Sequence, residues 1–266
     1  MRKSFLFKRS EEIILGSLLG DGSLKIHKNY RNARFSFRHS IHQKDYFFWK
    51  ASQLKDVSGE NYYWESEDKD GFGGKKLRYQ SMATQELTDL YNLICKNGRL
   101  KIQRRWLNLL TPLSLSIWWM DDGSIIGNGR KGVFCTESFF CEDQKILARY
   151  LKIVWKVDVH IGKIKRTWNG KEKIYYRLWI RSSEELKKFL RIILPQLKIQ
   201  SMLPKFLILY KDIDLQQRWI SEVGELTGFS KEIIEKHVSE KKNKWKIYGK
   251  ASENDIVRTS EQSEKT

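Results

Sequence analysis

The chain carries one short pattern twice: an apolar run of helix length that ends in Asp-Gly-Ser. The first copy is GSLLGDGS, residues 16–23, and the second closes TPLSLSIWWMDDGS, residues 111–124. Further landmarks repeat in the same order at nearly the same spacing, including the tetrapeptide LKIQ at 100–103 and 197–200. Self-similarity at a fixed period indicates a duplicated structural unit. The pattern therefore predicts two related half-domains, each opening with a helix that ends at an aspartate.

The repeat divides the chain into predicted domains. We expect a first half-domain over residues 8–107, a second over 108–211, a helical extension over 212–250 and a polar, disordered tail over 251–266. Apolar helical patterns and strands with period-two alternation follow one another in each half as α, β, β, α, β, β, α. The predicted fold class is therefore α+β, with helices covering one face of each sheet.

The ends of the two repeated helices have recognisable signals. In the first helix Ser10 is the expected N-cap and Gly22 the expected left-handed residue after the last turn. In the second helix we expect Thr111 as N-cap, Pro112 in the first turn and Gly123 at the end. Both helices are apolar nearly all round, so both are expected to be buried.

Alternation along the strands separates a core face from a polar face. In ARFSFRH, residues 33–39, Phe35 and Phe37 share the core face. In KIYYRLWIRS, residues 173–182, the core face is predicted to hold Ile174, Tyr176, Leu178 and Ile180. The opposite faces are polar and cationic.

Asp21 and Asp122 occupy unfavourable places if they are judged by stability alone. A carboxylate in the last turn of a helix opposes the helix dipole at a cost of about 0.3 to 1 kcal/mol, and two that converge repel each other. A divalent cation reverses this balance, because carboxylates and helix-terminal carbonyls are oxygen ligands that suit Mg²⁺. The alternative is that each aspartate simply belongs to an Asp-Gly turn.

The two repeated helices differ where they are expected to meet. Gly16 and Gly20 lie four residues apart on one face of the first helix, where missing side chains permit close approach of a partner helix. Ile117 and Asp121 stand at the matching places in the second helix. The interface is therefore expected to be asymmetric.

Composition narrows the class of partner. The formal net charge is +18 over 266 residues, with basic residues interleaved with aromatics throughout. Such a field attracts polyanions, among which nucleic acid is the commonest in cells, although a generally lysine-rich proteome would also produce it. Three cysteines in no metal-ligand spacing indicate neither a disulfide framework nor a zinc site. With no membrane-length apolar run and no secretory leader pattern, we expect a soluble intracellular protein without a membrane partner.

At ILGSLLGDG (residues 14–22) and LSIWWMDDG (115–123) the chain resembles the LAGLIDADG homing endonucleases, in their single-chain form with two motifs. The resemblance implies two pseudosymmetric αββαββα half-domains that form a saddle over double-stranded DNA. It further implies a monomer that makes a metal-dependent double-strand break across the minor groove of a long, asymmetric site. Relatives occur in mitochondria, chloroplasts and bacteria, which suggests an organelle or the bacterial cytoplasm.

The resemblance also assigns roles to residues. Asp21 and Asp122 would bind Mg²⁺, for which Mn²⁺ can substitute, with Gly20 and Asp121 as further metal ligands. Active-site lysines are expected at Lys101 and Lys205. Arg99 competes with Lys101 for this role, and Lys198 competes with Lys205.

Polar faces of the predicted strands supply candidate DNA contacts. Arginine suits guanine and glutamine suits adenine in the major groove, while many basic side chains contact only phosphate. The candidates are Arg34, Ser36, Arg38, Arg78, Gln80, Lys163, Lys165, Arg177 and Arg181.

Other functions remain open from sequence. An RNA maturase that helps its host intron to fold would keep the basic surface without requiring the aspartates, so intron RNA is a possible partner. A DNA-binding regulator that does not cut could use the saddle or the extension alone. Within the extension, residues 219–239 resemble a helix-turn-helix around Thr227, Gly228 and Phe229, whose alternative role is packing.

Overall fold

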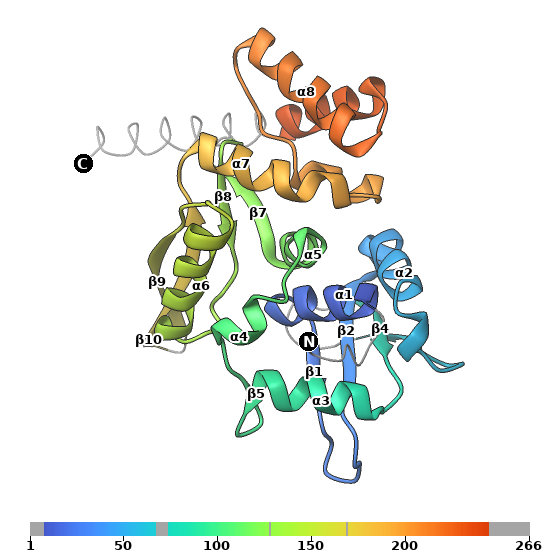
Figure 1. The fold of residues 1–266 in the computed structure, drawn as a ribbon. Helices are drawn as coiled ribbons and strands as arrows, with labels where there is room; N and C mark the ends of the chain where they lie inside the picture. Colours follow the sequence, from blue (N-terminus) through green and yellow to red (C-terminus); the bar gives the residue numbers. More distant parts are fainter. Residues whose placement is uncertain (1–7, 68–73, 128, 169, 245–266) are drawn as a thin grey trace, which may run out of the picture.

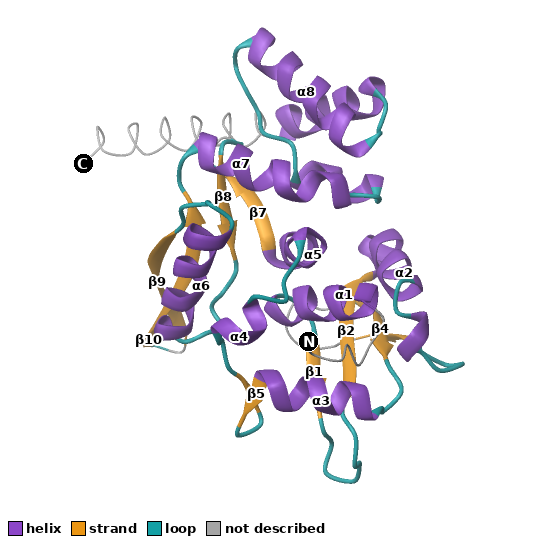
Figure 2. Cartoon of the chain, in the orientation of Figure 1, coloured by secondary structure: helices purple, strands orange, loops and turns teal. Residues whose placement is uncertain are grey.

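A computed structural model describes residues 8–67, 74–127, 129–168 and 170–244. The predicted disordered tail, residues 251–266, lies outside these described residues. The element order repeats, as the sequence predicts, and Figure 2 shows the alternation of helices and strands along the chain.

The first half has helices packed on one four-stranded sheet. Its strands run in the order β1-β2-β4-β3, with every neighbouring pair antiparallel. The bounds are α1 Lys8–Leu19, β1 Ser23–Lys25, β2 Arg34–Ser40, η1 Ile41–Gln43, α2 Lys44–Ser52, η2 Lys55–Val57, β3 Tyr63–Glu67, β4 Lys75–Gln80 and α3 Gln85–Ile94.

The second half repeats this topology, with an antiparallel sheet in the order β7-β8-β10-β9. Its bounds are α5 Pro112–Asp122, β7 Gly123–Ile126, β8 Lys131–Phe134, α6 Cys141–Val154, β9 His160–Trp168, β10 Lys171–Ile180 and α7 Ser183–Ile193. A short hairpin and a single-turn helix, which the repeat does not predict, join the halves: β5 Cys95–Lys96, β6 Arg99–Leu100 and α4 Arg104–Leu107. The α+β fold of paired αββαββα units is confirmed.

Helices α1 and α5 pack against each other at the centre of the molecule (Figure 1). A Cβ atom on Gly16 would lie 2.9 Å from Ile117 Cβ, and one on Gly20 would lie 2.5 Å from Asp121 Cβ. Both distances are too short for real carbon atoms, so glycine is required at both places. The expected close and asymmetric helix contact is therefore present, and one continuous apolar core extends across both halves.

The predicted helix ends are correct for α5 and wrong for α1. Thr111 caps α5 and accepts a hydrogen bond from the Ser114 amide, with Pro112 in the first turn. Ser10 lies inside α1 instead, where it is buried and donates to Asp56 and to the Gln53 carbonyl. Gly22 does not have a positive φ; a side chain there would collide with the Ser17 carbonyl, which accepts the Gly22 amide.

The predicted core face of β10 is only partly correct. Leu178 and Ile180 are buried, but Ile174 is 46 % exposed. The reason is that residues 171–177 of β10 pair only with β9, so this part of the hairpin extends beyond the sheet.

The last described residues form two helices. After η3 (Leu194–Gln196) and η4 (Gln200–Lys205), α8 runs over Ile213–Thr227 and ends at Gly228, whose φ is 79°. A further helix covers residues 231–244. Among the described residues, no helix combines the length and the apolar character needed to cross a bilayer.

Candidate active site

Asp21 and Asp122 lie at the ends of the two central helices. Asp21 lies two residues beyond the last residue of α1, Leu19, and Asp122 is the last residue of α5. Burial first, and then the charge of Asp121, raise the pKa of Asp21 to about 6. Burial first, and then the charge of Asp21, raise the pKa of Asp122 to about 7. The charge of Asp21 thus disfavours the ionised form of Asp122, which places the two carboxylates within electrostatic reach of each other.

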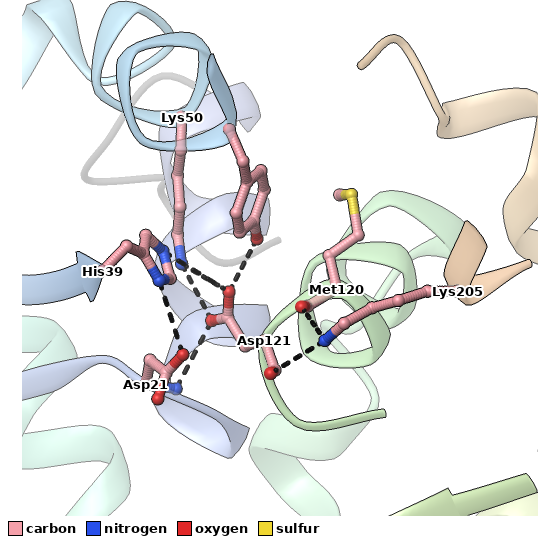
Figure 3. Close-up of polar contacts among 7 residues, drawn as sticks. Asp21, His39, Lys50, Met120, Asp121 and Lys205 are labelled. Atoms are coloured by element: carbon pink, nitrogen blue, oxygen red, sulfur yellow. Dashed lines mark hydrogen bonds and ion pairs between the residues drawn. The ribbon is translucent and has the colours of Figure 1, made fainter. Parts of the chain in front are cut away.

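A third carboxylate, Asp121, is held by donors from the first half-domain (Figure 3). Lys50 Nζ on α2 donates to both of its oxygens, at 2.9 Å to Oδ1 and 2.8 Å to Oδ2. The Tyr46 hydroxyl donates to Oδ1 at 2.6 Å. The side chains of Lys50 and Asp121 are both fully buried. The Asp121 carboxylate, expected as a metal ligand, is therefore already engaged by protein donors.

His39 joins this cluster, although the sequence analysis did not select it. Its Nδ1 lies 3.5 Å from Asp21 Oδ2, and its Nε2 lies 3.8 Å from Asp121 Oδ1 (Figure 3). Burial first, and then Lys50, lower the pKa of His39 to about 3, so the imidazole is neutral at physiological pH. Asp21, His39 and Asp121 together offer three possible ligand atoms within 4.8 Å of one another.

A signal for His39 was present in the strand alternation. His39 follows Phe35 and Phe37 at spacing two in β2, and so belongs to the core face of the sheet. A polar, titratable side chain on a core face needs buried partners. Lys50 and Tyr46 had no comparable signal, because their spacing on α2 is that of ordinary helical core positions.

The ammonium group of Lys205, a residue of η4, lies at the C-terminal end of α5. It donates to the carbonyl oxygens of Met120 and, at 3.2 Å, Asp121 (Figure 3). Burial lowers the pKa of Lys205, while the three aspartates act in the opposite direction. The competing candidate Lys198 is exposed on the surface. The structure therefore brings Lys205 to the aspartates.

Lys101 lies elsewhere. Its ammonium forms an ion pair at 2.8 Å with Asp143, in the first turn of α6. Arg99, its competitor, lines the same surface pocket beside the β5–β6 hairpin. Neither side chain has a described contact that links it to Asp21 or Asp122, so the predicted catalytic place of Lys101 is not supported by its surroundings.

A groove of about 460 Å³ leads from Asp21 across the first sheet. Four of the predicted DNA-contacting residues line it together with Asp21: Ser36, Arg38, Arg78 and Gln80. Arg34 lies at its side, donating to Gln80 at 3.2 Å and stacking on Tyr30. These side chains come from β2 and β4, whose paired register places Ser36 opposite Gln80 and Arg38 opposite Arg78.

The corresponding surface of the second half is arranged differently. Lys163 and Arg181 line a hollow of about 450 Å³ beside Trp179. Arg177 is held by Glu137, and Lys165 forms an ion pair with Glu172 at 3.0 Å. The predicted basic residues therefore lie on both sheets, and two of those on the second sheet, Arg177 and Lys165, are paired with acids.

The LAGLIDADG DNA endonuclease family pattern matches residues 11–189 of this chain. Among curated proteins the chain is 32 % identical to RecA of Mycobacterium gastri over 57 % of this chain and 38 % of that protein. It therefore spans well under half the length of that relative. It is 31 % identical to the cytochrome b mRNA maturase bI2 of Saccharomyces cerevisiae, covering 70 % of this chain and 45 % of the maturase.

One further relative is similar over most of its own length. DNA endonuclease I-ChuI of Chlamydomonas applanata is 27 % identical, covering 66 % of this chain and 84 % of the endonuclease. Among solved structures, the homing endonuclease I-WcaI bound to its DNA recognition sequence superposes with a TM-score of 0.62. That match has 23 % identity and covers 77 % of this chain and 88 % of the other.

Proposed function

Because this chain belongs to the LAGLIDADG DNA endonuclease family, we propose that it is a site-specific endonuclease that cuts both strands of a long, asymmetric DNA site. The observation that carries this proposal is the packing of α1 against α5, which puts Asp21 and Asp122 at the ends of two neighbouring helices, with a basic groove beside Asp21. Two acidic centres in one chain suit the cutting of two strands by a monomer.

The donor set fits divalent cations. Burial first, and then the charge of a neighbouring carboxylate, raise the pKa of both aspartates, and a bound cation would favour their ionised forms. We assign Asp21 and Asp122 as Mg²⁺ ligands, with the Gly20 carbonyl as a further oxygen and Mn²⁺ as a substitute metal. When bound, such ions lower the pKa of water and stabilise the leaving oxygen of a phosphodiester.

The remaining residues of the site have separate tasks. Lys50 neutralises Asp121, so the negative charge available to cations is that of Asp21 and Asp122. Lys205 places a positive charge beside the aspartates, where a scissile phosphate would need one. In the groove, Arg38, Arg78 and Gln80 are positioned to contact bases or phosphates, which sets the register of the DNA on the sheet.

The test is a cleavage assay on a duplex spanning the uninterrupted form of the gene that hosts this coding sequence. We expect linear double-strand products with Mg²⁺ and none with chelator. Asp21→Asn and Asp122→Asn are each expected to abolish double-strand cleavage, whereas Asp214→Asn, on the exposed start of α8, is expected to leave it unchanged. Full cleavage by both site variants would contradict the site assignment.

A second function is favoured by one specific finding, the 31 % identity to the yeast maturase bI2. A maturase would bind folded intron RNA through the same basic surface without needing the two aspartates. Stimulation of intron splicing by the Asp21→Asn variant, with no DNA cleavage by the unaltered protein, would favour this function. Sequence-specific DNA binding without either activity would instead indicate a regulator.

A further inference from the structure

The two C-terminal helices are built into the molecule and do not project from it. Trp219, Ile220 and Val223 of α8 are buried, and so are Ile234 and Val238 of the helix over 231–244. In Figure 1 these helices lie beside α7, and Arg191 of α7 forms an ion pair with Glu222 of α8. The segment that a DNA-binding helix-turn-helix would expose is therefore used largely for packing.

One partly buried cation in this extension has no acidic partner among the described residues. Lys241 donates two hydrogen bonds of 2.8 Å, to the carbonyl oxygens of Pro204 and Leu207. Burial lowers the pKa of Lys241 to about 8. Removing an ammonium from water without a carboxylate partner is costly, and an apolar side chain would avoid that cost. The role of Lys241 therefore depends on the two carbonyls that it holds.

The two carbonyls flank the active-site lysine. Pro204 immediately precedes Lys205 in η4, and Leu207 follows it by two residues. The Lys205 carbonyl itself accepts a 2.9 Å hydrogen bond from the Trp119 indole on α5. The main chain on both sides of Lys205 is thus held by two elements, α5 from one side and the C-terminal helix from the other.

Local structure explains why this segment needs external donors. A 3₁₀ helix has poorer hydrogen bonds than an α-helix, and its final carbonyls lack partners within the helix. Pro204 also contributes no amide hydrogen. Without Lys241, the Pro204 and Leu207 carbonyls would lose the charged donor that orients them, and Lys205 would have more freedom.

We propose that Lys241 is a positioning residue that holds the 204–207 segment so that Lys205 reaches the end of α5, and that the C-terminal extension thereby completes the active site. The proposal rests on the proposed endonuclease function for its effect on catalysis. Its structural part concerns only the placement of the Lys205 ammonium and can be measured without DNA.

The experiment compares Lys241→Met, Lys241→Arg and a matched control, Lys236→Met, from the exposed face of the same helix. Three quantities are measured for the full chain. The first is the rate at which an amine-acetylating reagent modifies Lys205, followed by peptide mass spectrometry. The second is the single-turnover cleavage rate on the host-gene duplex at saturating enzyme, and the third is the dissociation constant for that duplex.

We expect Lys241→Met to fold, to bind the duplex within about twofold of the unaltered protein and to cleave about 10- to 100-fold more slowly, since small misplacements of catalytic groups have effects of that size. Acetylation of Lys205 should become several-fold faster. Lys241→Arg, which keeps a charged donor, should recover much of the loss, and Lys236→Met should change neither rate.

The outcomes separate the two proposals. An unaltered protein that cuts no DNA contradicts the endonuclease function, while the acetylation rates still test the placement of Lys205. If Lys241→Met reacts and cleaves as the unaltered protein does, the positioning role is wrong. It is also wrong if Lys241→Met fails to fold, because Lys241 would then support the fold as a whole.

Discussion

At the scale of single residues, the pairing of Lys50 with Asp121 decides how much negative charge the site presents. Three ionised carboxylates, those of Asp21, Asp121 and Asp122, would repel one another strongly in a partly buried site. Lys50 reaches across from α2 of the first half to α5 of the second and neutralises Asp121. Asp121, the additional acid of the second motif, thus links the two halves through its ion pair with Lys50. The carboxylate charges that remain are those of Asp21 and Asp122.

Breaking this buried pair on one side should be costly. We expect Lys50→Met to lower the free energy of unfolding by about 3 to 5 kcal/mol, because it leaves the Asp121 charge buried without its cation. Adding Asp121→Asn should restore much of the loss. Urea unfolding followed by tryptophan fluorescence measures both effects, with the exposed Lys44→Met of the same helix as control. Equal stability of Lys50→Met and the unaltered protein would contradict the charge-pair account.

The raised pKa values of Asp21 and Asp122 predict how stability depends on pH. The folded protein binds protons between about pH 4 and pH 7 that the unfolded chain does not, so these two groups make stability fall as pH rises across that range. Without metal, their contribution should therefore make the melting temperature lower at pH 8 than at pH 5.

Mg²⁺ should act in the opposite direction, because it binds the ionised carboxylates of the folded state. We expect it to raise the melting temperature more at pH 8 than at pH 5. Differential scanning fluorimetry of the unaltered protein and of the Asp21→Asn/Asp122→Asn double variant measures the difference. A Mg²⁺ shift of the same size in both proteins would place the metal elsewhere.

At the scale of elements, the packing of α1 on α5 depends on two missing side chains. Gly16 faces Ser114 and Ile117, and Gly20 faces Asp121, across a contact in which a methyl group has no room. The close approach brings the ends of both helices, and hence both aspartates, to one place. The helix interface and the candidate active site are therefore parts of one feature.

A methyl group at Gly16 should force these helices apart. We expect Gly16→Ala to lower the free energy of unfolding by about 1 to 3 kcal/mol, the usual cost of overpacking, and to slow cleavage as well. The matched control is Gly224→Ala in α8, where the added Cβ meets only ordinary contacts at 3.4 Å and beyond. That change should raise stability by about 0.5 to 1 kcal/mol. A stabilised Gly16→Ala protein would contradict the close packing.

At the scale of the whole molecule, the chain has a net charge of +18, and the basic residues of its two sheets have different surroundings. The first sheet has Arg38 and Arg78 in a groove that begins at Asp21. On the second sheet Arg177 is tied to Glu137. Two sheet surfaces with different side chains and hollows suit an asymmetric DNA target.

Electrostatic binding of this kind should depend steeply on salt. We expect log K for duplex DNA to fall with log of the salt concentration with a slope of about −3 or steeper, and Arg78→Ala to reduce that slope by about 1. Fluorescence anisotropy between about 50 and 200 mM salt measures it. Lys236→Ala, on the exposed face of the C-terminal helix, serves as control. A slope near zero would exclude the basic surface as the DNA-binding surface.

Much of the fold could be read from the sequence because it is encoded locally and twice. Apolar periodicity, the Thr111 and Pro112 start of α5 and the repeated Asp-Gly ends all act over a few residues, and the duplication doubles each signal. Local signals failed where tertiary contacts replaced them. Ser10 is a good cap by type, yet it lies inside α1 and bonds to a distant segment.

The sequence alone determined the repeat, the two aspartates and the glycines that let their helices meet. Only the tertiary structure decided which lysine side chains lie beside the aspartates. Lys50 and Lys205 are separated from Asp121 by 71 and 84 positions, and Lys101, which looked equivalent, pairs with Asp143 instead. Many lysines are spread along this chain, and no local rule distinguishes a surface lysine from one that the packing of distant elements brings to a carboxylate or a carbonyl.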